Sequence, residues 1–174
     1  MNSHPYHEIY FAGGCFWGAE KFFRLVKGVL ETEVGFANGN TQNPTYKEVY
    51  TDLTGFAETV RVRYDPSVIS VRELTGLFLQ MVDPLSVNRQ GEDRGTRYRT
   101  GVYYTDPADE AEIAAAFVEV ERALDQPLAV ERMPLRNYFP AEEEHQRYLE
   151  KNPAGYCHLS PAVFKLAKAF MPKK

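Results

Sequence analysis

The sequence predicts an α+β protein with a ferredoxin-like core, in which two helices cover one face of a four-stranded sheet. Segments that alternate every two residues, as strands do, are interleaved with segments of helical periodicity. Their order along the chain is βαββαβ, the order of the split βαβ motif. The chain has 174 residues, 44% of them hydrophobic and 25% charged, so it can bury the core that this fold needs.

The core elements are predicted from periodicity and from residues that break it. Gly13 and Gly14 end a short β-type run, and Gly28 ends the helical spacing that follows. Ser70 and Glu73 form a capping box at the start of the second helix. In order, the predicted elements are strand 8–12, helix 16–27, strand 29–36, strand 58–64, helix 70–82 and strand 98–105.

Additional elements follow the core. We expect a helix over 107–124, a short strand over 128–132 and C-terminal helices over 141–150 and 161–170, with a coil-rich tail and Cys157 in the turn between the last two helices. No repeat or linker divides the chain. We therefore expect one catalytic domain over 1–174, with a core at about 8–133 and a C-terminal helical segment at about 134–174.

Composition and charge exclude several classes of partner. The formal net charge of −4 and the pI near 5.6 give no reason to expect nucleic acid or an anionic membrane as a partner. Residues 1–10 lack the apolar stretch of a secretory signal, and no run approaches the length of a membrane span. We expect a cytoplasmic monomer. In that reducing compartment, a pair of cysteines is more often catalytic or metal-binding than structural.

Cys15 is the first candidate for chemistry, because it lies where a strand ends and a helix begins. Unpaired backbone N–H groups and the positive end of the helix dipole favour a thiolate there. Phe16 and Trp17 follow directly and could form an apolar wall for a methyl group or thioether. The alternative for all three is ordinary core packing.

Residues 13–20, GGCFWGAE, resemble the active-site motif of the peptide-methionine (S)-S-oxide reductases, the A class of methionine sulfoxide reductases. The likeness continues through residues 43–46, 54–58 and 88–99, and it ends at residues 155–158, GYCH. It therefore spans nearly the whole chain.

The resemblance implies a complete reaction cycle. Cys15 attacks the sulfur of methionine S-sulfoxide, protein-bound or free, releases methionine and is left as a sulfenic acid. Cys157 condenses with this sulfenic acid to form a disulfide, which thioredoxin reduces. No metal and no prosthetic cofactor are implied, because thioredoxin supplies the reducing equivalents.

Four further residues take roles from the resemblance. Glu58 corresponds to the acid that donates a proton to the weakly basic sulfoxide oxygen. Tyr46 and Tyr98 correspond to tyrosines that hydrogen-bond this oxygen, and Asp93 to an acidic residue that organises the site. Without the motif, Glu58 reads as a solvated strand residue paired with Arg61 or Arg63, the tyrosines as packing residues, and Asp93 as an exposed loop charge.

The chain departs from the family pattern at four points. Family members commonly carry His at position 56, Tyr at 36 and Gly at 38, where this chain has Phe56, Phe36 and Asn38. Polar groups beside Glu58 are therefore lost. We expect the hydration and the pKa of Glu58 to differ from those of other family members, whereas the reaction should be the same. Some relatives also carry a third cysteine in the tail, which this chain lacks. We therefore expect thioredoxin to open the Cys15–Cys157 disulfide directly.

Three alternatives remain open at this point. Cys15 and Cys157 with His145 and His158 could form a zinc site, although no C-x-x-C or H-x-x-x-H spacing is present. Cys15 could instead be the nucleophile of a cysteine hydrolase, paired with one of these histidines. The third alternative is the reductase class that handles the R epimer, whose paired C-x-x-C zinc motifs are absent here.

Overall fold

The computed structural model describes residues 6–173. The strands are β1 (His7–Gly13), β2 (Val29–Ala37), β3 (Ala57–Tyr64), β4 (Arg89–Gln90), β5 (Asp93–Arg94), β6 (Thr100–Tyr104), β7 (Glu131–Pro134) and β8 (Tyr138–Pro140). The α-helices are α1 (Phe16–Arg24), α2 (Tyr46–Tyr50), α3 (Val71–Met81), α4 (Asp109–Leu124), α5 (Tyr148–Lys151) and α6 (Pro161–Ala169). Two 3₁₀ turns are η1 (Thr96–Tyr98) and η2 (Glu143–His145).

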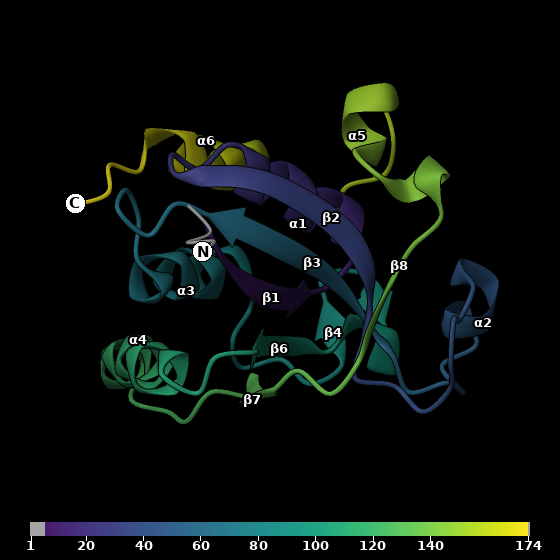
Figure 1. Ribbon diagram of the computed structural model, residues 1–174, viewed down its shortest axis with the longest axis horizontal. Helices are drawn as coiled ribbons and strands as arrows, with labels where there is room; N and C mark the ends of the chain where they lie inside the picture. Colours follow the sequence, from purple (N-terminus) through teal and green to yellow (C-terminus); the bar gives the residue numbers. More distant parts are fainter. Residues whose placement is uncertain (1–5, 174) are drawn as a thin grey trace, which may run out of the picture.

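The main sheet has the strand order β7-β6-β1-β3-β2-β8 (Figure 1). Its neighbouring strands are antiparallel, except that β6 and β7 are parallel. Helix α1 connects β1 to β2, and α3 lies between β3 and β6 along the chain. The protein is therefore a mixed α/β fold built on a central, mostly antiparallel sheet.

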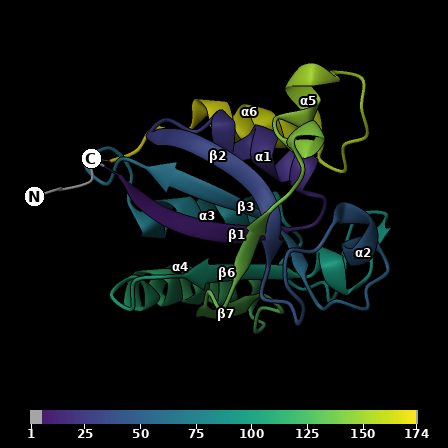
Figure 2. The same cartoon turned by 45° about the vertical axis from the view of Figure 1, so that its right-hand side comes forward.

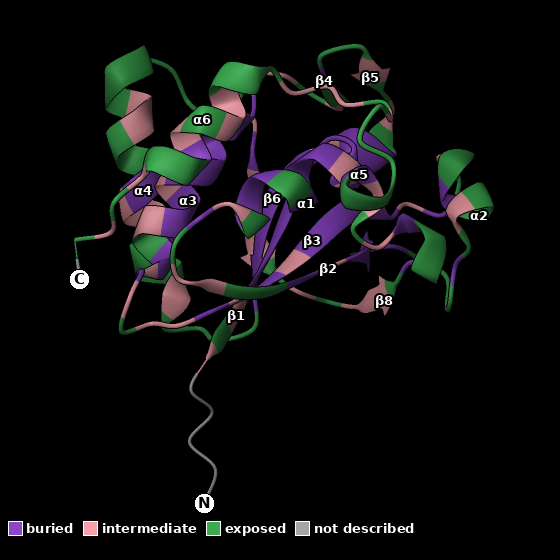
Figure 3. Cartoon of the chain, turned by 90° about the horizontal axis from the view of Figure 1, so that it is seen from above, coloured by how far each residue is buried: buried purple, intermediate pink, exposed green. Residues whose placement is uncertain are grey.

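The two faces of the sheet bury different sets of side chains. On β1, Ile9 and Phe11 belong to the large core that also contains residues of α1, α3, α4 and α6. The alternate residues Tyr10 and Ala12 face a smaller cluster, which residues 133–138 cover. This alternation follows from the two-residue period of a strand. Figure 3 shows the central strands and the inner faces of the helices as buried, whereas β5 and β8 are only partly buried or exposed.

Phe11 joins three elements of the large core. Its ring stacks on Phe23 of α1 at 4.7 Å and on Phe78 of α3 at 4.9 Å, measured between ring centroids. Because Phe11 is fully buried, truncating it to Ala should cost about 3–5 kcal/mol of stability. This packing holds α1, and with it Cys15, against the end of β1.

Both edges of the main sheet are short. The outer strands β7 and β8 have four and three residues. Each ends in a proline, Pro134 or Pro140, which has no backbone N–H to donate.

The predicted order of core elements is confirmed, with changes at several boundaries. Ser70 and Glu73 form the predicted capping box. The first helix ends at Arg24 rather than residue 27, and the last core strand begins at Thr100, because residues 96–98 form a 3₁₀ turn. The strand expected over 128–132 lies at 131–134, and strands β4, β5 and β8 and helix α2 were not predicted.

The continuous helix predicted over 141–150 is wrong. Arg147 has a left-handed backbone with φ of +50°, which separates η2 from α5. The Gln146 side chain bonds the backbone of Val34 instead, accepting from its N–H at 2.9 Å and donating to its C=O at 2.8 Å. The Gln146 side chain thus binds this segment to the outer edge of β2, and the chain does not continue as a helix there.

Within the described residues, no helix is long and apolar enough to cross a membrane.

Candidate active site

The predicted site residues gather at one end of the sheet, where β1 ends and α1 begins. In Figures 1 and 2, helices α2 and α5 lie at this same end. Cys15 is the N-cap of α1 and is 3% exposed. Gly14 precedes it with φ of +82°, and a β-carbon there would lie 2.8 Å from the Gln90 side chain and 3.0 Å from His158 Nε2. Glycine is therefore required at position 14 for both conformation and space.

The environment of Cys15 does not favour the thiolate that its place at a helix start predicts. Burial raises the pKa of Cys15 well above its ordinary value, and the nearby Glu58 carboxylate raises it further. The backbone N–H of Trp17 opposes this rise. Desolvation thus outweighs the helix end, and the resting sulfur is a neutral thiol at neutral pH.

Glu58 lies on β3, opposite Phe36 of β2 in the sheet register, and is 1% exposed. Its Oε1 accepts a 3.1 Å hydrogen bond from the backbone N–H of Phe16. Burial raises the pKa of Glu58 to about 8, although the Phe16 N–H and Arg97 oppose the rise. Glu58 is therefore mostly protonated at neutral pH. Its side chain is hydrogen-bonded to the residue that follows the nucleophile.

The alternative reading of Glu58 as a solvated residue paired with an arginine is wrong. Arg61 and Arg63 instead form ion pairs with Glu8 and Glu31, and Arg61 also pairs with Glu33.

Tyr46 and Tyr98 lie at the start of α2 and at the end of η1. Burial raises the pKa of both hydroxyls, and the Glu58 carboxylate is the next cause in each case. Cys15 contributes to both rises as well. Both tyrosines therefore remain protonated donors, in electrostatic contact with the thiol and the carboxyl group.

Aromatic rings form a wall beside Cys15. Phe16 is fully buried, with its ring 5.6 Å from that of Phe36. Trp17 is only partly buried and stacks on Tyr148 of α5 at 3.8 Å between ring centroids. The indole N–H of Trp17 donates to Nδ1 of His145 at 3.2 Å. Trp17 is thus the better placed of the two predicted wall residues to face a substrate.

The segment that carries Cys157 lies against the same end of α1. Asp93, on the β4–β5 hairpin, accepts a 2.7 Å hydrogen bond from the Tyr156 hydroxyl on Oδ1, and its Oδ2 lies 3.8 Å from Nδ1 of His158. A β-carbon on Gly18 would lie 3.1 Å from Cys157 Sγ. Because Gly18 is three residues after Cys15, the second thiol packs on the helix face next to the first. Both cysteines are free.

The Asp93 side chain is 10% exposed, so the expectation of an exposed loop charge does not hold.

Several residues of the site were missed or misread from the sequence. Tyr148, Tyr156 and Arg97 received no role, and His145 and His158 entered only as possible zinc ligands or bases. Among residues 6–173, no group of three or more His, Cys, Asp and Glu side chains is arranged to hold a metal ion. His145 accepts from Trp17 and His158 faces Asp93. Arg97, Tyr156 and His158 lie inside the quoted segments 88–99 and 155–158, which was the signal available for them, whereas Tyr148 and His145 lie outside every quoted segment.

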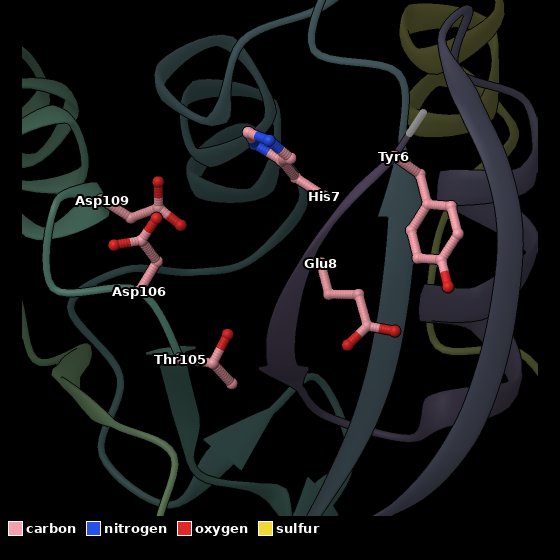
Figure 4. A pocket seen from close by; sticks show the side chains of 6 residues that line it. All are labelled: Tyr6, His7, Glu8, Thr105, Asp106 and Asp109. Carbon is pink, nitrogen blue, oxygen red and sulfur yellow. The ribbon is translucent and has the colours of Figure 1, made fainter. Parts of the chain in front are cut away.

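A separate hollow lies at the other end of β1 (Figure 4). It is lined by Tyr6, His7, Glu8, Thr105, Asp106 and Asp109. None of these residues belongs to the predicted site, since β1 runs from His7 to Gly13 and Cys15 follows its far end.

Two free thiols meet at the start of α1, one of them beside a buried carboxyl group, and such a pair can be oxidised to a disulfide; the site therefore indicates a thiol-based oxidoreductase. The comparisons with known proteins identify the family. The family model described as "Peptide methionine sulfoxide reductase" matches residues 7–173. The chain is 51% identical over 160 residues to a peptide methionine sulfoxide reductase MsrA of Lachnoclostridium phytofermentans, covering 92% of this chain and 96% of that protein.

Solved structures agree with this result. Mxr1 from Saccharomyces cerevisiae in its reduced form is similar with a TM-score of 0.86 and 35% identity, over 99% of this chain and 95% of that one. Mxr1 in complex with Trx2 is similar with a TM-score of 0.60 and 28% identity, over 85% and 89%. The chain belongs to the peptide methionine sulfoxide reductase family. It is an oxidoreductase that reduces methionine sulfoxide.

Proposed function

We propose that this enzyme reduces the S epimer of methionine sulfoxide, protein-bound and free, with Cys15 as nucleophile and Glu58 as acid. The observation that carries this assignment is that both groups are buried at one place: the Glu58 side chain accepts a hydrogen bond from the backbone N–H of Phe16, the residue after Cys15. A carboxyl group with a pKa of about 8 is mostly protonated at neutral pH, as a proton donor to the sulfoxide oxygen must be.

In the first step, the Cys15 sulfur bonds to the sulfoxide sulfur while Glu58 donates a proton to the oxygen. Oxygen passes to Cys15 as the thioether leaves, which yields methionine and a sulfenic acid, and the thiol proton replaces the one that Glu58 gave. Tyr46 and Tyr98 hydrogen-bond the oxygen. Trp17, with Phe16 behind it, faces the methyl group. Asp93 helps to organise this site.

In the second step, the Cys157 thiol attacks the sulfenic sulfur, forms the Cys15–Cys157 disulfide and releases water. The packing of Cys157 on Gly18 supports this role. Thioredoxin then reduces the disulfide and is itself oxidised, so that no prosthetic cofactor takes part. The complex of Mxr1 with Trx2 supports thioredoxin as the partner.

One assay tests the assignment. A peptide carrying racemic methionine sulfoxide is incubated with the enzyme, thioredoxin, thioredoxin reductase and NADPH, and the two epimers are followed by chromatography. We expect only the S epimer to disappear, and we expect the Cys15→Ser variant to consume neither. Consumption of the R epimer would overturn the assignment.

We also propose a ferredoxin-like classification for β1, α1, β2, β3, α3 and β6, within a single catalytic domain. The strand order β6-β1-β3-β2 with α1 and α3 on one face supports it.

A further inference from the structure

Arg97 is a buried cation at the edge of the proposed active site, and none of the steps above uses it. It lies in η1, next to Tyr98, and is 8% exposed. Its guanidinium carbon lies 4.1 Å from the ring centroid of Tyr50 and 4.3 Å from that of Tyr98. Both distances are well within the range of cation–π contacts. The guanidinium is therefore in contact with the rings of two tyrosines, one of which is proposed to bind the sulfoxide oxygen.

Asp52 fixes the position of Arg97. Its Oδ2 lies 2.5 Å from Nη1 of Arg97, and its Oδ1 accepts the backbone N–H of the same residue at 3.0 Å. Nη1 also donates to the backbone carbonyl of Tyr50 at 3.2 Å. Side-chain and main-chain bonds to one carboxylate leave the arginine little freedom to turn away. Its Nε has no hydrogen-bond acceptor among the described residues.

The charge of Arg97 acts on Glu58 in a setting that is otherwise apolar or acidic. Phe36, opposite Glu58 in the sheet register, and Phe56, two residues before it, are both buried. The charged and titratable groups that act on Glu58 or respond to it come from every neighbouring element: Arg97, Asp93, Asp52, Cys15, Tyr46 and Tyr98. Arg97 is the cation among them, and it opposes the burial that raises the pKa of Glu58.

We propose that Arg97 is a positioning residue for sulfoxide reduction: it fixes the ring of Tyr98 by stacking, and its charge stabilises the Glu58 carboxylate that remains once the proton has passed to the substrate oxygen. This inference rests on the roles proposed above for Glu58 and Tyr98. The two contributions of Arg97 are separable, because stacking depends on the planar guanidinium, whereas stabilisation of the carboxylate depends only on the charge.

The first experiment separates them by single-turnover kinetics, which excludes recycling, across pH 6 to 10. Arg97→Gln removes the charge, so Glu58 should hold its proton to higher pH. The alkaline limb of the rate profile then moves upward by on the order of one pH unit. Arg97→Lys keeps the charge but loses the planar stack. The alkaline limb of its profile should stay near that of the wild type, while the sulfoxide concentration that gives half the maximal single-turnover rate rises several-fold.

The matched control is Arg99→Gln, which removes the same charge two residues further along. Arg99 binds Glu131 and the backbone carbonyl of Asn38 instead. Its alkaline limb should coincide with that of the wild type. An Arg97→Gln profile that also coincides with the wild type, or an Arg99→Gln profile that moves as far as that of Arg97→Gln, would overturn the proposal.

A second readout does not depend on turnover. Titration of the carbon-13 signal of the Glu58 carboxyl group in wild type and in Arg97→Gln measures the proton affinity directly. We expect the midpoint of Arg97→Gln to be the higher of the two, and equal midpoints would contradict the role of the charge. If Glu58→Gln left the rate profile unchanged, the proposed acid would be wrong, whereas this titration would still test Arg97.

Discussion

The two cysteines lie in regions that are held in different ways. Cys15 lies at the junction of a central strand and a helix, and its partner Glu58 belongs to β3, which pairs with both β1 and β2. The backbone ladders and the core beneath them fix both residues. Cys157 lies on the irregular segment between α5 and α6; Tyr156 on one side of it is exposed, and the side chain of His158 on the other side is buried against the start of α1.

A few side-chain bonds hold the region around Cys157. Buried Glu20 of α1 accepts the backbone N–H of Arg147 at 2.7 Å and the Thr32 hydroxyl at 2.8 Å. Tyr156 binds Asp93 further along. The attacking thiol is therefore preorganised by the sheet, whereas the segment of the resolving thiol is held mainly by side-chain contacts. The two steps of the cycle should therefore respond to different mutations.

The largest expected effect is on recycling. Cys157→Ser should reduce one equivalent of sulfoxide per enzyme at a normal rate and then stop, because the sulfenic acid has no thiol to condense with. Cys15→Ser should not react at all. The measurement is burst amplitude against steady-state turnover with thioredoxin as sole reductant. Continued turnover of Cys157→Ser would show that the two regions do not divide the cycle in this way.

The next effect concerns only the region of Cys15 and Glu58. Glu58→Gln should slow the first turnover by about 100-fold or more, because the sulfoxide oxygen loses its proton donor. The pKa of Glu58 is about 8, so the wild-type rate should fall as pH rises through that value and the acid becomes a carboxylate. Glu58→Gln should lose this fall. Rapid-quench measurements of methionine formation across pH would show it, and a retained alkaline fall would assign the ionisation to another group.

A smaller effect is expected from a change in the segment around Cys157. Tyr156→Phe removes the hydroxyl that donates a hydrogen bond to Asp93 and keeps the ring. Because Tyr156 is 47% exposed, we expect disulfide formation to slow by only about three- to tenfold. The first turnover should change less than this. Loss of free thiols after one equivalent of sulfoxide measures the step, and a larger loss in methionine formation than in disulfide formation would contradict the division.

The smallest effect tests the packing of Cys157 on α1. Gly18→Ala places a β-carbon 3.1 Å from Cys157 Sγ, so disulfide formation should slow by about two- to threefold. Gly76→Ala on α3 is the matched control, since a β-carbon there meets nothing within 4 Å. Both changes remove a helical glycine and share its gain in helix stability. Equal disulfide rates in the two variants would mean that Cys157 is not held against Gly18.

The sequence predicted the region of Cys15 and Glu58 better than the segment around Cys157, for physical reasons. Strand alternation and the Ser70 cap are local signals, and the structure follows them. The break at Arg147 depends on bonds from Gln146 and Glu20 to residues more than 100 positions away, which no local pattern contains. The state of Cys15 was misjudged for the same reason, because the helix start is visible in the sequence and the burial that outweighs it is not.

The motif placed Glu58, Tyr46, Tyr98 and Asp93 in one site, and the structure brings them to the same end of the sheet. Nothing in the spacing indicated that Tyr156 would bind Asp93 or that Arg97 would stack on Tyr98. These contacts join segments that are each irregular, so only the folded chain defines them.

The two short, proline-ended edge strands bear on how this protein meets its substrates. Oxidised polypeptides are often partly unfolded, and an unfolded chain readily adds as a further strand to an open sheet edge. Here each outer strand is only three or four residues long and stops at Pro134 or Pro140, so an incoming chain finds few backbone groups to pair with. Short edges of this kind limit edge-to-edge pairing, which is one route by which a folded sheet aggregates with unfolded chains.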